Sequence, residues 1–153
     1  MKNNFNNANE ALNFCADVRE TIENAAPRSA WDKGVRDYAL ELLDDYEEAV
    51  KWAEDNGEAI PGLSEDVLLN GATDWKQYSW GGSSLIYDAD IAKRLCSPSE
   101  LKRCKGGERN PNAREQWLDV QARALYQAKN SLLLTAGNIS HYGENAVYAN
   151  AAC

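Results

Sequence analysis

Apolar residues recur every three or four positions in three long stretches of the chain, the spacing that places side chains on one face of an α-helix. The first stretch covers residues 9–25 and ends before Pro27, which lacks the amide hydrogen that a helix interior uses. This pattern predicts a helix with one buried face. Its predicted inward positions are Leu12, Cys15, Ala16, Val18 and Ile22.

The second stretch, residues 30–56, is the most clearly amphipathic part of the chain. Ser29 is a suitable N-cap, and together with Asp32, three residues later, it resembles a capping box. Gly57 favours termination of the helix. The predicted inward positions are Trp31, Val35, Tyr38, Leu42, Tyr46, Val50 and Ala53. The predicted opposite face carries Asp37, Glu41, Asp44, Asp45, Glu48 and Asp55.

The third stretch predicts a helix over residues 112–135 that closes at Gly137. Its predicted inner positions are Trp117, Gln121, Ala124, Leu125, Ala128 and Leu132. Start signals between the long helices predict short helices at residues 65–69, 74–78, 89–95 and 99–104, with one short strand at 83–87.

These elements predict one mainly all-α domain over residues 1–153. We expect two to three long helices in a bundle, a group of short helices on one side, and at most one minor strand pair. Residues 1–7 are predicted to be a flexible lead-in, and residues 138–153 a C-terminal tail.

Charge is unevenly distributed along this chain of net charge −8. Residues 1–70 hold 16 acids and 6 bases, whereas residues 71–153 hold 8 acids and 10 bases. Residues 41–58 contain eight acids and one base, and residues 93–114 contain seven bases and two acids. The sequence therefore predicts one acidic and one basic surface, each suited to a different partner.

The acidic face of the second helix is the main candidate binding surface. The carboxylates follow one another at spacings of three, four and seven residues. At a rise of about 1.5 Å per residue, each helical turn separates neighbours by about 5–6 Å along the axis. Such a row of fixed negative charge can imitate a nucleic-acid backbone and bind a basic channel. The plainer alternative is a solvated helix face, as many proteins have.

The basic stretch offers a secondary surface. Its central residues are Lys102, Arg103, Lys105 and Arg109. Bases beside the glycine pair Gly106-Gly107 are typical of a loop that contacts phosphates. A solvated loop, or an internal partner for the acidic helix, explains the same pattern.

Residues suited to catalysis or metal binding are few. His141 is the only histidine, so a multi-histidine zinc site is excluded, and we expect neither a metal nor a cofactor. The four cysteines have no zinc or redox spacing and are expected to be free thiols. A Cys–His enzyme remains an alternative. Without a signal peptide or an apolar span of about 20 residues, we expect a cytoplasmic protein.

The run from Trp80-Gly81-Gly82, through residues 84–88, 99–103 and 107–109, to residues 117–125 resembles small uncharacterised proteins of phages and mobile elements of Gram-positive gut bacteria. The resemblance covers about residues 75–130. It carries over no site residue and implies only a setting in which small acidic proteins often inhibit host defence, anti-CRISPR proteins among them.

Three hypotheses follow. The first is a non-catalytic inhibitor that binds a nucleic-acid-handling protein, such as a CRISPR nuclease, through the acidic helix face. The second is an accessory protein of a mobile element that binds nucleic acid through the basic cluster at 93–114. The third is a small Cys–His enzyme. Nucleic acid that co-purifies with the protein would favour the second hypothesis over the first.

Overall fold

The computed structural model describes residues 5–64 and 113–149, with side chains described from residue 123 onward in the second range. These residues form three α-helices and one short 3-10 turn and contain no strand, which confirms the all-α prediction for this part of the chain. The elements are α1 (Ala8–Glu23), α2 (Ala30–Asp55), α7 (Ala113–Tyr142) and η2 (Gly143–Asn145).

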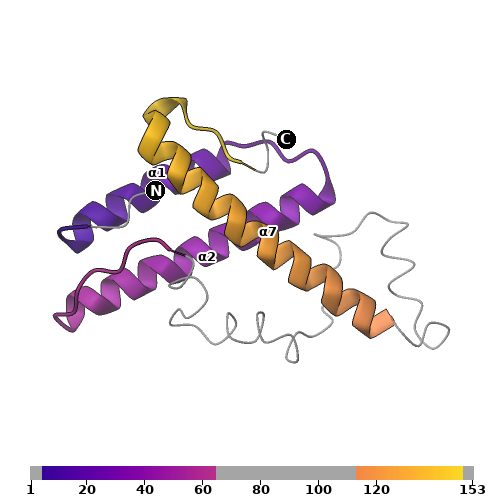
Figure 1. Ribbon diagram of the computed structural model, residues 1–153, viewed down its shortest axis with the longest axis horizontal. Helices are drawn as coiled ribbons and strands as arrows, with labels where there is room; N and C mark the ends of the chain where they lie inside the picture. The colour runs from indigo at the N-terminus through magenta and orange to yellow at the C-terminus, as the bar shows by residue number, and fades with distance from the viewer. Residues whose placement is uncertain (1–4, 65–112, 150–153) are drawn as a thin grey trace.

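The helix α2 is the central element of this arrangement. A short connection over residues 24–29 lets α1 and α2 pack against each other as an antiparallel hairpin. The long α7 crosses α2 and meets α1 near its own C-terminal end (Figure 1). Because α2 contacts both other helices, its apolar stripe lies at the centre of the core.

Both ends of α2 are defined by local hydrogen bonds that the sequence predicts. The Ser29 hydroxyl accepts a hydrogen bond from the Asp32 amide at 3.1 Å, which satisfies a free donor of the first turn. Gly57 adopts a φ of 66°, a left-handed conformation that favours glycine. The Glu58 amide then donates to the Ala53 carbonyl at 2.8 Å, as in a Schellman motif. Gly57 thus ends the helix as predicted.

Buried apolar side chains from all three helices form one core. The predicted stripe of α2 is confirmed from Val35 to Ala53, while Trp31 is partly buried and donates from Nε1 to Gln127 Oε1 of α7 at 2.8 Å. The predicted inner residues of α7 that are described, from Ala124 to Leu132, are buried as well. The largest fully buried side chains are Ile22, Leu42, Leu43, Tyr46, Leu63, Leu125 and Leu132.

The first helix differs slightly from its prediction. It begins at Ala8, where the Asn7 side chain accepts a hydrogen bond from the Glu10 amide at 2.8 Å. Phe5, within the predicted lead-in, is buried against the core and lies 5.6 Å from the Phe14 ring, centroid to centroid. Ala16, a predicted inward position, is exposed. The buried face of α1 is centred near Val18, and Cys15 lies between this centre and Ala16 around the helix.

The third helix is longer than predicted. It passes through Gly137 and ends at Tyr142, so residues 138–142 of the predicted tail are helical. A glycine inside a helix costs only about 1 kcal/mol relative to alanine. Ala136 is buried and Ile139 packs against the core, and this packing outweighs the weak local preference. The glycine that follows the end of α7 is Gly143, whose φ of 59° is a left-handed conformation that favours glycine.

The two segments that follow α2 and α7 fold back onto the core. Tyr46 Oη donates to the Pro61 carbonyl at 2.6 Å, and Leu63 is fully buried. At the other end, the Ala149 amide donates to Thr135 Oγ1 at 3.2 Å, and Tyr148 is 3% exposed. Both segments therefore belong to the packed structure.

Several predicted elements lie outside the described residues. They are the short helices between 65 and 104, the strand at 83–87, the turn at Trp80-Gly81-Gly82, and the side chains of Trp117 and Gln121.

The first prediction concerns the α2 stripe. Leu42→Ala should lower the free energy of unfolding by about 2–5 kcal/mol, because it leaves a cavity at a fully buried position. The matched variant Leu134→Ala, at a side chain 60% exposed, should lose less than about 0.5 kcal/mol. Urea denaturation measures both; equal losses would contradict the assigned orientation of the helices.

Candidate functional site: the acidic surface of α2

The rotation of α2 about its axis decides which acids reach solvent. Burial of Leu42 turns Asp44, Glu48 and Asp55 outward, and all three are exposed. Residues three positions apart lie about 60° from each other around a helix. Asp45 therefore follows Leu42 to the buried side and is only 6% exposed. The prediction that Asp45 lies on the exposed acidic face is therefore wrong.

The remaining two predicted acids lie at the edge of this face. Asp37 and Glu41 are partly buried, and each has at least one further interaction within the chain, as does Asp45. The acidic face is therefore more fully exposed along the C-terminal half of α2 than along the N-terminal half.

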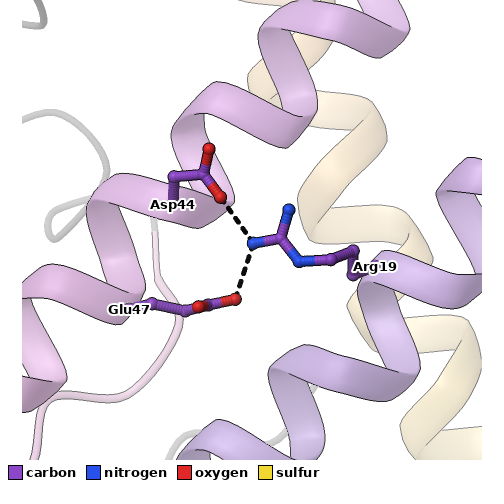
Figure 2. A network of polar contacts seen from close by, with 3 residues as sticks. All are labelled: Arg19, Asp44 and Glu47. Carbon is purple, nitrogen blue, oxygen red and sulfur yellow. Dashed lines mark hydrogen bonds and ion pairs between the residues drawn. The ribbon is translucent and has the colours of Figure 1, made fainter.

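A cation from α1 binds the middle of this surface. Figure 2 shows the Arg19 guanidinium between two carboxylates of α2, and its Nη2 donates to Asp44 Oδ1 and to Glu47 Oε1, each at 2.6 Å. The Arg19 and Glu47 side chains are 27% and 24% exposed, whereas that of Asp44 is 63% exposed. This bridge joins α1 to α2 and neutralises part of the acidic surface.

The ion pairs with Asp44 and Glu47 raise the pKa of Arg19. Partial burial acts to lower the pKa of the guanidinium, but the hydrogen bonds that it donates to Glu47 and Asp44, together with the negative charges of these carboxylates, raise the pKa above its ordinary value. Arg19 is therefore a permanent cation at this position. Its contribution to stability is modest, since partly exposed ion pairs contribute about 0.2–1 kcal/mol.

Neither Arg19 nor Glu47 is among the residues that the sequence pattern predicts for this surface. A signal for Arg19 exists, because it lies four residues after Cys15 and so borders the buried stripe of α1. The identity of its partners has no local signal, since 25 and 28 residues separate Arg19 from Asp44 and Glu47. Only the packing of α1 on α2 brings the three together.

The secondary basic surface falls outside the described residues. Its residues are Lys102, Arg103, Lys105 and Arg109. That they form a basic surface stays a prediction.

The described thiol is not suited to nucleophilic chemistry. Cys15 is free and fully buried, and burial, with a smaller effect of the Glu47 carboxylate, raises its pKa to about 12. His141 is exposed near the end of α7, with its ring edge-on to Tyr142 at 4.5 Å between centroids. Cys15 therefore does not serve as the nucleophile of a Cys–His pair, and the other three cysteines lie outside the described residues.

Within residues 5–64 and the described part of 113–149, no three His, Cys, Asp or Glu side chains are grouped to hold a metal ion. In the same residues, no helix combines the length and hydropathy that a membrane crossing requires.

Comparison with known proteins adds no relative. No protein-family model, curated protein or solved structure matches the chain.

The second prediction concerns Cys15. Because its pKa is raised, little thiolate exists near neutral pH, and iodoacetamide should alkylate it at least about tenfold more slowly in the native protein than in urea. Mass spectrometry of the tryptic peptide that contains Cys15 measures the rate separately from the other cysteines. Equal rates in buffer and in urea would show that the thiol is accessible.

Proposed function

We propose that the protein is a non-catalytic inhibitor that binds a nucleic-acid-handling protein, of the kind represented by a CRISPR nuclease, through the acidic surface of α2. The observation that carries the proposal is the exposure of Asp44, Glu48 and Asp55 on a helix whose opposite face is fully buried. The backbone positions that carry these carboxylates are fixed, because the core holds the helix.

The spacing of the three acids suits a phosphate-binding channel. Glu48 follows Asp44 by four residues, about 6 Å along the axis, and Asp55 follows Glu48 by seven residues, about 10 Å. Lys and Arg side chains that normally bind a phosphate backbone would instead meet a row of carboxylates along the helix. Each contact is weak by itself, but several together steer association and exclude the nucleic acid.

The proposed surface differs in two residues from the predicted set. It excludes Asp45, which is buried, and it includes Glu47, which shares the Arg19 bridge with Asp44. The chain between residues 5 and 64 holds 14 acids and 5 bases, so the long-range field of this part is strongly negative. Such a field favours a basic partner surface and repels free nucleic acid.

The third prediction tests the surface with a matched pair of variants. Glu48→Lys should weaken inhibition about tenfold, because it places a cation against the basic channel. Glu23→Lys makes the same charge change at an exposed position on α1 and should change inhibition less than about twofold.

The measurement is displacement of labelled nucleic acid from the effector that the protein captures in its host. Affinity for the effector should also fall as salt rises. Equal effects of the two variants would mean that only the net charge of the protein matters, which would contradict the proposal. Loss of inhibition only with Lys102→Glu would assign the function to the basic cluster instead.

The fourth prediction uses the Arg19 bridge. Arg19→Gln removes the cation that neutralises Asp44 and Glu47, so the acidic surface becomes more negative. Affinity for the basic effector should rise about twofold to tenfold, while the free energy of unfolding falls by at most about 1 kcal/mol. Calorimetric titration at low salt measures the affinity. A weaker complex from a variant that remains folded would mean that Arg19 itself contacts the partner.

A further inference from the structure

A groove lies between α1 and the C-terminal end of α7, away from the acidic surface of α2. Its volume is about 1250 Å³, and its walls come from the second half of α1, the residues that follow α1, the end of α7, η2 and the returning C-terminal segment. Figure 1 shows the yellow end of α7 and the segment after it close to α1. The groove has apolar walls contributed by Phe14, Ile139, Val147 and Tyr148.

The charged side chains that line the groove are all acidic. Asp17 and Glu20 of α1 and Glu144 of η2 line it, all three are exposed, and the described lining residues include no Lys or Arg. Arg19 lies on the same helix but points elsewhere. At about 100° per residue it stands about 160° from Asp17 around α1, on the side that contacts α2.

Two helix ends add to the negative potential of the groove. The helices α1 and α7 end at Glu23 and Tyr142, and residues on both sides of these two positions line the groove. The C-terminus of a helix carries about half a negative elementary charge, and its last carbonyls lack partners within the helix. The last turn of α1 contains no basic residue, and that of α7 contains only His141. The Arg36 guanidinium of α2 offsets part of this charge, since it donates to the Ala25 carbonyl at 3.0 Å, but Arg36 does not line the groove.

We propose that this groove binds a peptide segment of a partner protein in which Lys or Arg side chains flank one apolar anchor. The anchor packs against Val147, which is 55% exposed, and its apolar neighbours, and the cations bind the Asp17, Glu20 and Glu144 carboxylates. This site is distinct from the α2 surface and does not depend on the function proposed above.

The chemistry of the groove argues for a peptide over smaller ligands. Sites for small molecules are usually about 300–1000 Å³ and enclose most of the ligand, whereas this groove is larger and open. A bare metal ion does not fit, since no metal-holding group of side chains exists in the described part of the chain. An extended cationic segment uses both the acidic rim and the apolar walls.

The fifth prediction is tested with a phage-displayed library of random dodecapeptides selected on the full chain. Selected peptides should be enriched in Lys or Arg next to an aliphatic or aromatic residue. Their affinity should fall at least about tenfold for the variant Asp17→Lys, Glu20→Lys, because the rim becomes net positive. The control variant Glu54→Lys, Glu58→Lys has the same net charge and changes two exposed acids that belong neither to the groove nor to the acidic surface of α2. It should change affinity less than about twofold.

A measurement on the unmodified protein keeps the test independent of variant stability. Addition of a selected peptide should shift the backbone amide resonances of residues 17–25 and 139–148 and leave those of residues 48–58 in place. Selection of peptides without positive charge, equal losses in the two double variants, or shifts confined to residues 48–58 would overturn the proposal. Shifts that depend on protein concentration without peptide would identify a second copy of the chain as the occupant.

Discussion

Burial of the α2 stripe between α1 and α7 is the constraint on which the rest of the structure depends. Leu42, Leu43 and Tyr46 have no exposed surface, so the helix cannot rotate without opening the core. That fixed rotation turns Glu48 outward and Asp45 inward. The charge pattern on the exposed side of α2 is therefore a consequence of core packing.

The fold was largely predictable because its signals are local. Helical spacing of apolar residues located all three long helices, and cap residues placed both ends of α2 at Ser29 and Gly57. The end of α7 was not predictable in this way. Gly137 is a common terminator, but the helix continues because Ala136 and Ile139 gain contacts with distant parts of the chain. Tertiary packing of this kind leaves no mark on a local pattern.

The candidate surface was predictable only in part. Counting acids on one helix identified Glu48 and Asp55 correctly as exposed, because both lie well away from the buried stripe. Asp45 lies at the border of that stripe, where a shift of a few tens of degrees decides burial. The Arg19 bridge depends on the offset between two antiparallel helices, and the groove depends on where the C-terminal segment returns to α1. Both are long-range relations.

The central claim is that exposed carboxylates of α2 contact cations that normally bind nucleic acid. Zero-length carbodiimide cross-linking of the protein with its captured partner, followed by mass spectrometry, tests this contact directly. The account predicts amide bonds between Glu48 or Asp55 and lysines of a nucleic-acid-binding channel in the partner. Cross-links that involve only lysines of residues 93–114, or a partner that binds no nucleic acid, would contradict it.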